Sequence, residues 1–307
     1  MIITRLRGGL GNQLFQYACG RALSLRTDNP QKLDIEGYER AANGDTPRSY
    51  LLSHFNIIED IATLDEIRRL KYPFGIASKA WRYASTKFLR RFNTGYIPRY
   101  MHAKGDIYLD GFWQTELYFA DTETTIRKEL TLKDPLGATA QTFADQIVAA
   151  KKNGVTTVSL HVRRGDVARD AFKNPYYGIT TPAYYKKALA ALVEKLAARA
   201  GNGENAARQN IRIFVFSDGI EWTKENIDIP FPTTYVDGGD ASNKIADYED
   251  LALMSMCDHN IVANSSFSWW GAWLNPNPEK IVIAPKDWIR TNKHRHKDTV
   301  PSSWIRV

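Results

Sequence analysis

Two adjacent arginines, Arg163 and Arg164, directly follow a run of apolar and β-branched residues near the middle of the chain. The run 155–162 has the composition of a buried parallel strand, which would deliver His161 and both arginines to the carboxyl edge of a sheet, where ligands bind. Each guanidinium offers a planar fork of N–H donors that matches phosphate or carboxylate. The stretch is therefore typical of a di-anion site, although an ion pair between an arginine and Asp166 would use the same residues.

Two further polar loops are expected at the same edge. A predicted strand over 211–216 leads into Ser217 and Asp218, and another over 261–263 leads into the polar segment 264–267. The hydroxyls of this last segment, with a helix N-terminus behind them, can receive phosphate oxygens, so the three loops predict a cradle for a nucleotide diphosphate. The two serines of the segment have an equally ordinary role as helix caps.

A metal ion has little support in these motifs. Mg²⁺ that binds a sugar nucleotide is usually held by an Asp-x-Asp pair, and the nearest match, Asp-Tyr-Glu at 247–249, falls on a predicted helix. His294 and His296 stand in a basic stretch without a carboxylate or thiol cluster. We expect no metal and no other cofactor, because preorganised guanidiniums can neutralise a departing diphosphate instead.

A glycine-rich turn near the start of the chain is a second candidate ligand loop. A short apolar strand at 2–6 runs into Gly-Gly-Leu-Gly-Asn-Gln at 8–13 and then into a helix. This order brings backbone N–H groups up to a ligand, but it also occurs in plain strand–helix connections. It is not a dinucleotide fingerprint, because Leu14 occupies the third glycine position.

The elements that must position these loops alternate between strand and helix. From residue 153 onward five such alternations predict an α/β unit with a doubly wound parallel sheet. The 307 residues suffice for two domains, which we place at 1–152 and 153–307, with the last residues packing back on the first. In the first domain we predict a strand at 107–109, loops around short elements over 30–60 and an amphipathic helix at 79–92.

Composition favours a globular protein of a reducing compartment. No segment approaches the ~20 apolar residues of a membrane span, and no signal-peptide run opens the sequence, so we expect a cytoplasmic location. Cys19 and Cys257 stand in apolar helical patterns and are expected to pack rather than to bridge. The interval 67–105 holds ten Lys or Arg and no acid. We interpret it first as a packed helix and second as a site of peripheral contact with the inner membrane surface, and we expect no nucleic acid.

Five motifs together resemble one enzyme family. HVRRGD at 161–166, FVFSDGIEW at 214–222 and NSSFSWWGAWL at 264–274 resemble the three ordered motifs of the α-1,2-fucosyltransferases, glycosyltransferase family 11. GGLGNQLFQYACGRAL at 8–23 and GFWQTELYF at 111–119 are similar to its N-terminal blocks. The matches span nearly the whole chain in the right order.

The resemblance implies a GT-B-like α/β fold, in which two Rossmann-like domains have parallel sheets that face each other across a cleft. It implies GDP-fucose as donor, the 2-hydroxyl of a galactose-terminated oligosaccharide as acceptor, inversion at the anomeric carbon and no metal. Arg163 would contact the β-phosphate, His161 would help to position the donor, and Asp250 would read the guanine. The further residues that we predict near the donor, or near the acceptor in the last two cases, are Arg164, Gly11, Asn12, Ser217, Asp218, Asn264, Ser265, Ser266, Phe267, Trp113 and Gln114.

Three alternatives stay open at this point. Asp166 is the nearest candidate for the general base, although a structural role in orienting Arg164 is favoured. Related motifs occur in α-1,6- and protein O-fucosyltransferases, so the linkage is open. A binding protein without catalysis, acting through the basic interval 67–105, is the alternative from another class.

Overall fold

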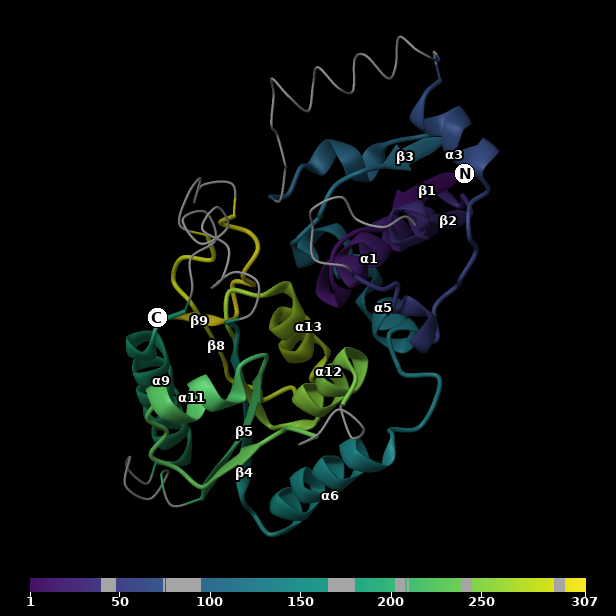
Figure 1. Cartoon of the computed structure of the whole chain (residues 1–307). Helices are drawn as coiled ribbons and strands as arrows, with labels where there is room; N and C mark the ends of the chain where they lie inside the picture. Colours follow the sequence, from purple (N-terminus) through teal and green to yellow (C-terminus); the bar gives the residue numbers. More distant parts are fainter. Residues whose placement is uncertain are drawn as a thin grey trace. The chain divides into compact units, whose positions relative to one another are not determined.

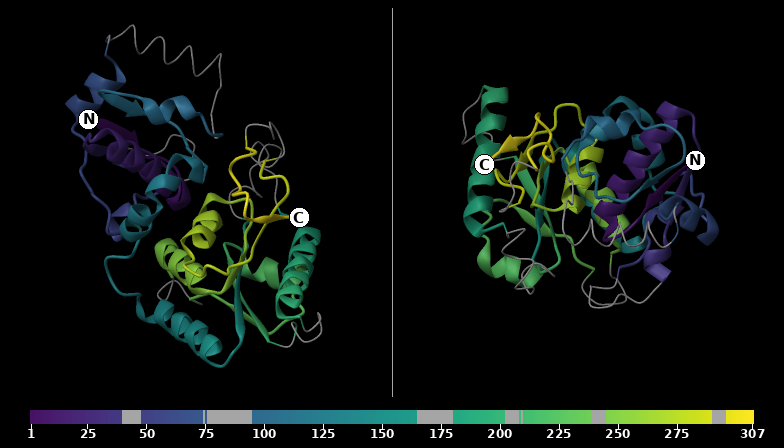
Figure 2. Two further views of the ribbon diagram at one scale, coloured as in Figure 1. Left: turned by 180° about the vertical axis from the view of Figure 1, so that it is seen from behind. Right: turned by 90° about the horizontal axis from the view of Figure 1, so that it is seen from above.

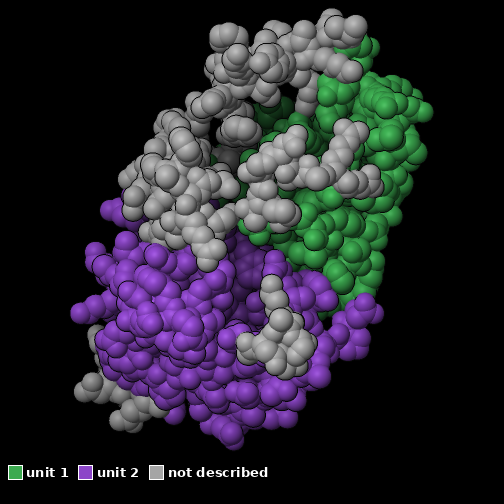
Figure 3. All heavy atoms as spheres, in the orientation of Figure 1, with its two compact units in different colours: residues 1–133, 295–299 green, residues 134–294, 300–307 purple. Residues whose placement is uncertain are grey.

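The computed structural model describes residues 1–39, 48–73, 75, 95–164, 180–201, 208, 210–238, 245–289 and 296–307. The chain divides into two compact units (Figure 3): unit 1 is Met1–Lys133 with Arg295–Thr299, and unit 2 is Asp134–His294 with Val300–Val307. The sequence placed the division after residue 152. The division between the units falls earlier because helix α6 (Ala138–Lys152) belongs to unit 2. Its residues Ala144 and Ile147 share a hydrophobic core with Phe214 and Leu253 of that unit.

The described part of unit 1 holds a three-stranded parallel sheet in the order β2-β1-β3. Its strands are β1 (Ile2–Arg5), β2 (Gln31–Asp34) and β3 (Ile107–Leu109). Helix α1 (Leu10–Thr27) packs closely on one face, and α3 (Leu64–Lys71) covers the other (Figure 1). The remaining short elements are α2 (Glu36–Glu39), η1 (Leu52–His54), η2 (Pro98–His102), η3 (Glu116–Tyr118), η4 (Ala120–Thr122) and α5 (Glu123–Glu129).

Strand β2 is one of the short elements within residues 30–60, and the sequence did not show which residues form it. Half of its four residues are buried polar groups, Gln31 and Asp34, which hide the strand from an apolar pattern. Gln31 donates to Thr4 and to the backbone of Tyr17, and Asp34 accepts from the Tyr108 hydroxyl at 2.5 Å. The predicted helix at 79–92 lies outside the described residues.

Unit 2 is built on a six-stranded sheet, counted over the described residues, in the order β6-β5-β4-β7-β8-β9. Every neighbouring pair is parallel, which confirms the predicted parallel α/β class. The strands are β4 (Thr156–Val162), β5 (Ile211–Ser217), β6 (Thr233–Tyr235), β7 (His259–Ile261), β8 (Val282–Ala284) and β9 (Ile305–Arg306). The prediction that the sheets of the two units face each other across a cleft stays a prediction.

Helices cover both faces of this sheet (Figures 1 and 2). On one face α9 (Pro182–Ala200) and α11 (Ile220–Asn226) pack against alternate residues of β4, among them Val158, Leu160 and Val162. On the other lie α6, α12 (Asp247–Met256) and α13 (Ser266–Leu274). Because side chains alternate along a strand, His161 and Arg163 belong to the second face and Arg164 to the first.

Helix α13 is mostly apolar and lies deep in unit 2. Trp269 and Trp270 are fully buried and Trp273 nearly so, with ring centroids 5.1–6.1 Å apart. These three tryptophans therefore pack in the core of unit 2. Cys19 and Cys257 are likewise buried and do not form a disulfide, as expected.

Candidate active site

The strand order of unit 2 reverses direction beside β4. From β4 the chain proceeds outward to β5 and β6, and it then returns to lay β7, β8 and β9 on the opposite side. The crevice outside the carboxyl ends of two strands at such a switch point is the usual ligand site of an open parallel sheet. Here those strands are β4 and β7, which are followed by Arg163 and by Ser265. The topology thus leads to two residues that the sequence analysis selected.

Arg163 and Ser265 are joined at this position. The Arg163 Nη1 donates to the Ser265 Oγ at 3.3 Å. The same Oγ accepts from the backbone N–H of Phe267, also at 3.3 Å, and so caps α13. A helix N-terminus carries a partial positive charge, which adds to the charge of the guanidinium. The corner is electrostatically suited to an anion such as a diphosphate.

His161 lies beside this corner as a buried neutral ring. Its side chain is 7% exposed, and its ring centroid is 5.6 Å from that of Phe267. Burial lowers the pKa of His161 to about 4, with Arg163 acting in the same sense and Asp218 opposing it. Near pH 7 the imidazole is therefore uncharged, and it can orient a ligand through hydrogen bonds rather than through charge.

Arg164 points away from Arg163. Its backbone N–H donates to the Asp218 carboxylate at 2.7 Å, and its guanidinium Cζ lies 3.7 Å from the centre of the Trp222 ring. The two guanidiniums therefore diverge to opposite faces of the sheet instead of forming a side-by-side pair. The sequence analysis gave Trp222 no role, although it is the last residue of the motif at 214–222. Its position four residues after Asp218, in the first turn of α11, could have indicated that it lies near the site.

Ser217 and Asp218 are both engaged within the chain. The Ser217 Oγ accepts from the Gly219 N–H at 3.0 Å and lies 3.1 Å from the Thr223 Oγ1. Asp218 holds the end of β4 through the Arg164 N–H. These contacts order the loop after β5, and direct donor contacts of either residue stay a prediction.

The other predicted donor residues of unit 2 are placed as follows. Asp250 lies in the first turn of α12, Asn264 precedes the cap of α13, and Ser266 is its first residue. Asp166 lies outside the described residues. The guanine contact of Asp250 and the role of Asp166 stay predictions.

In unit 1 the glycine turn is tied to the loop after β3. Gly8 has φ +80°, and a Cβ there would lie only 2.7 Å from the Asn12 Nδ2, so the turn requires glycine. The Asn12 Oδ1 accepts from the Gln114 Nε2 at 2.8 Å, and Gly11 is buried in the first turn of α1. Asn12 and Gln114, predicted separately, thus form one polar unit.

Trp113 is buried and does not offer an exposed ring on which a sugar could stack. Its side chain is 6% exposed, and its ring meets Tyr100 and Tyr118 edge-on at 5.3 and 5.4 Å. Its φ of +53° is unusual for a residue with a bulky side chain. The indole is packed inside unit 1, which does not favour the predicted acceptor contact.

A charged cluster that sequence reasoning missed lies next to the glycine turn. Asp110 forms ion pairs with Arg5 at 3.2 Å and with Arg7 at 3.6 Å, and the Arg7 guanidinium lies 4.4 Å over the Phe112 ring. Arg5 ends β1, and Asp110 directly follows β3. Adjacent parallel strands bring these residues together, and their separation in sequence hid the pair.

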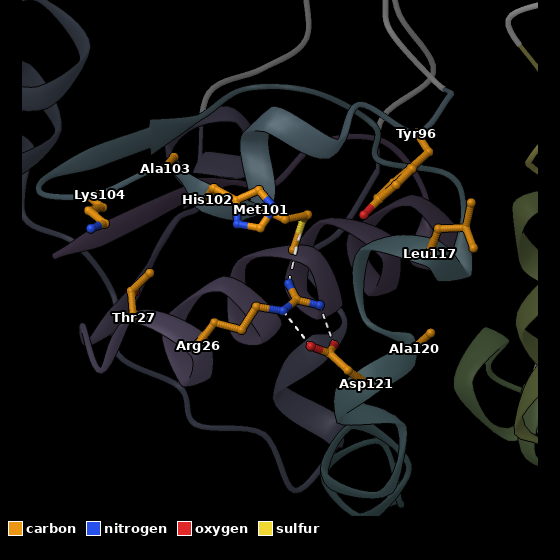
Figure 4. A pocket seen from close by; sticks show the side chains of 10 residues that line it. All are labelled: Arg26, Thr27, Tyr96, Met101, His102, Ala103, Lys104, Leu117, Ala120 and Asp121. Carbon is orange, nitrogen blue, oxygen red and sulfur yellow. Dashed lines mark hydrogen bonds and ion pairs between the residues drawn. The ribbon is translucent and has the colours of Figure 1, made fainter.

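A pocket of unit 1 lies at the other end of α1 (Figure 4). Its volume is about 560 Å³, and Arg26 in its wall is bonded to Asp121 and to the Met101 sulfur. At 1.5 Å per helical residue it lies about 24 Å along α1 from the glycine turn. None of the predicted site residues lines it.

The described residues contain neither a cluster of metal ligands nor a helix that could span a membrane. Within them, no three His, Cys, Asp or Glu side chains gather as metal ligands would. None of the described helices combines the length and the apolar character that a bilayer crossing requires. The expectation of metal independence stays a prediction.

Comparison with known proteins decides the family. The model of "Glycosyl transferase family 11" matches residues 1–307, the whole chain. The protein belongs to this family. An Escherichia coli α-1,2-colitosyltransferase is 30% identical over 314 residues, covering 100% of this chain and 99% of its own. The O-antigen biosynthesis glycosyltransferase WbnK of Escherichia coli is also 30% identical, with 98% and 99% covered. The galactoside α-(1,2)-fucosyltransferase 2 of Sus scrofa is 26% identical, with 90% and 70% covered.

The fold of this family 11 member also has a solved counterpart. The crystal structure of the fucosyltransferase NodZ from Bradyrhizobium matches with a TM-score of 0.50 at 16% identity, covering 90% of this chain and 93% of that one. The predicted GT-B-like α/β fold class and the family resemblance are confirmed. The protein is a glycosyltransferase of a fucosyltransferase family.

Proposed function

We propose that this glycosyltransferase moves L-fucose from GDP-fucose to the 2-hydroxyl of a terminal β-galactose in a glycan, with inversion at the anomeric carbon. The observation that carries the proposal is the Arg163–Ser265 contact at the switch point of the unit 2 sheet. It creates a cationic corner with a helix N-terminus behind it. Similarity to an α-1,2-colitosyltransferase over the whole chain, and to a galactoside α-(1,2)-fucosyltransferase over 90% of it, supports the linkage.

The chemistry follows from where charge develops. As the bond between fucose and the β-phosphate breaks, the leaving GDP gains negative charge. Arg163 and the N-terminus of α13 are held in place before the reaction and stabilise that charge without reorganisation. His161, uncharged near pH 7, orients the donor without adding to the positive charge of the corner. No metal ion is required by this arrangement.

The acceptor hydroxyl must lose its proton to a base. Asp166 is our candidate, because it follows Arg163 and Arg164 in the sequence motif. Asp166→Asn would then abolish transfer while leaving the slow hydrolysis of GDP-fucose intact. Equal losses in both reactions would indicate that Asp166 orients Arg164 instead.

The experiment that tests the function is a transfer assay with GDP-fucose and lactose, in the presence and absence of EDTA. We expect an α-1,2-linked product in both conditions and a fall of about 10²–10³-fold in kcat for Arg163→Ala, the usual effect of removing one donor that stabilises transition-state charge. A near-normal rate for Arg163→Ala would refute the proposal. A product with an α-1,6 or O-fucosyl linkage would agree with GDP-fucose as the donor and would contradict the proposed acceptor hydroxyl.

A second donor is favoured by one specific observation. A relative aligned with the entire chain is named for colitosyl transfer. Colitose differs from fucose only in lacking the 3-hydroxyl, so a GDP-binding corner would serve both nucleotides equally. The ratio of kcat/KM for GDP-fucose and GDP-colitose distinguishes them, because a site that hydrogen-bonds the 3-hydroxyl discriminates strongly against its absence.

Contact with the inner membrane surface through the interval 67–105 is a separate proposal. Within its described residues Arg68 and Arg69 are exposed, with side-chain exposures of 68% and 65%. Sedimentation with anionic vesicles that weakens as salt increases would support peripheral binding. Absence of binding at low salt would refute it.

A further inference from the structure

Trp222 lies directly against a guanidinium of the candidate donor site. The Arg164 Cζ is 3.7 Å from the centre of the Trp222 ring, which is van der Waals contact with the ring face. Trp222 stands in the first turn of α11, partly buried, and packs on the core that β4 shares with α9. The indole is therefore a fixed platform rather than a mobile surface group.

The segment from Asp218 to Trp222 contacts Arg164 at three points. Asp218 accepts from the Arg164 backbone N–H at 2.7 Å. A Cβ on Gly219 would lie 3.5 Å from the Arg164 Cβ, so the backbone passes close to the base of the side chain. The Trp222 ring contacts the guanidinium itself. The segment from Asp218 to Trp222 thus supports both ends of one arginine.

We infer that Trp222 is a positioning residue for the donor diphosphate and acts through Arg164. The inference deepens the proposed function and depends on it. A guanidinium that stacks on a ring uses its flat face, so its N–H groups, which lie in its plane, stay available to a phosphate. An arginine without such a platform loses rotamer entropy when a ligand fixes it, whereas a stacked one is ordered before the ligand arrives.

This arrangement assigns different tasks to the two arginines. Arg163 is directed to the cap of α13 on one face of the sheet, and Arg164 to α11 on the other. A diphosphate has two anionic groups that can be approached from two sides. Two guanidiniums that diverge at the strand end and are each held by a different helix suit such a ligand.

The test is a double-mutant cycle on GDP and GMP binding, measured by calorimetry with the full chain. The variants are Trp222→Leu, Arg164→Ala and their combination, with Trp222→Phe to retain a ring. Lys224→Gln is the matched control: it removes another cation–ring contact of α11, with Tyr235 at 5.4 Å, and the exposed pair with Glu221. Thermal unfolding of each variant shows that it is folded.

We expect Trp222→Leu to weaken GDP binding about 5- to 30-fold and Trp222→Phe to weaken it less than about 5-fold, as the strength of cation–π contacts suggests. The loss should be smaller for GMP, which lacks the second phosphate. In the Arg164→Ala background Trp222→Leu should add little, because both changes remove the same contribution. Lys224→Gln should bind GDP like the wild type.

Three results would overturn the inference, and the last of them is distinguishable from the first two. Additive losses for Trp222→Leu and Arg164→Ala, or equal losses for GDP and GMP, would mean that Trp222 supports the fold and not the arginine. If the wild type binds no GDP, the proposed function fails and the inference fails with it.

Discussion

The Ser265 hydroxyl lies between the Arg163 guanidinium and the Phe267 backbone N–H, 3.3 Å from each. One oxygen therefore joins a guanidinium of the candidate site to the start of the helix behind it. The orientation of Arg163 and the integrity of α13 are coupled through this atom. The coupling gives the first prediction.

Ser265→Ala should affect both stability and binding. The change removes an N-cap, which costs about 1 kcal/mol of unfolding free energy, and it removes an acceptor from Arg163. We expect a loss of about 10-fold in GDP affinity, because one charge-assisted hydrogen bond that fixes the arginine is lost. Thr181→Ala is the control, since Thr181 caps α9 in the same way. It should destabilise similarly and leave GDP affinity unchanged; a similar loss of affinity in both would contradict the coupling.

Asn12 and Gln114 should act as one unit in acceptor use. Their 2.8 Å hydrogen bond fixes the glycine turn against the loop after β3. We predict that Asn12→Ala and Gln114→Ala each raise the KM for lactose several-fold, and that the double variant is no worse than the more affected single one. Initial rates at saturating donor check this. Multiplicative increases in the KM of the double variant would show that the two side chains act independently. Gln141→Ala, on the exposed face of α6, serves as control.

Stability should fall as the solution is acidified, in part through His259. Burial lowers the pKa of His259 to about 4, with Asp258 opposing, and its Nδ1 accepts from the Ile281 N–H at 3.0 Å. Between pH 6.5 and 4 the unfolded chain therefore binds a proton that the folded ring does not, so acid favours unfolding. We expect the loss of unfolding free energy from pH 7 to pH 5 to be smaller in His259→Asn by about 2 kcal/mol. Chemical denaturation followed by tryptophan fluorescence measures it, and an unchanged pH dependence would exclude His259 as a source.

Gly20 is a close-approach position between α1 and β1. A Cβ there would lie 2.1 Å from the Thr4 Oγ1 and 2.5 Å from the Gln31 Nε2. Gly20→Ala should therefore destabilise unit 1 by about 1–3 kcal/mol, although alanine favours helix formation by about 1 kcal/mol. Gly9→Ala, which would meet nothing within 4 Å, is the control for stability. Equal melting temperatures of the two variants would contradict the packing argument.

Much of unit 2 could be predicted because its strands carry an apolar pattern. The runs before Arg163 and Ser217 are β-branched and apolar, so the ends of these two strands were located correctly. Strand β2 could not be found in this way, because the partners of Gln31 and Asp34 come from distant parts of the chain. The pairing of Asp110 with Arg5 and Arg7 was hidden for the same reason.

The divergence of Arg163 and Arg164, however, could have been predicted from the sequence. Val158, Leu160 and Val162 define one face of β4, so the residues that follow must alternate as well. Adjacent arginines at a strand end cannot both point to one face while the strand geometry continues. Their different partners, by contrast, depend on where α11 and α13 pack and required the structure.

The burial of α13 has a practical consequence for altering the enzyme. Its first residue borders the candidate site, while the following tryptophans fill the interior of unit 2. Random changes across 265–270 would mostly yield chains that do not fold, whatever substrate is offered. Attempts to broaden donor choice by directed evolution should instead leave these tryptophans unchanged and vary residues outside the core of unit 2.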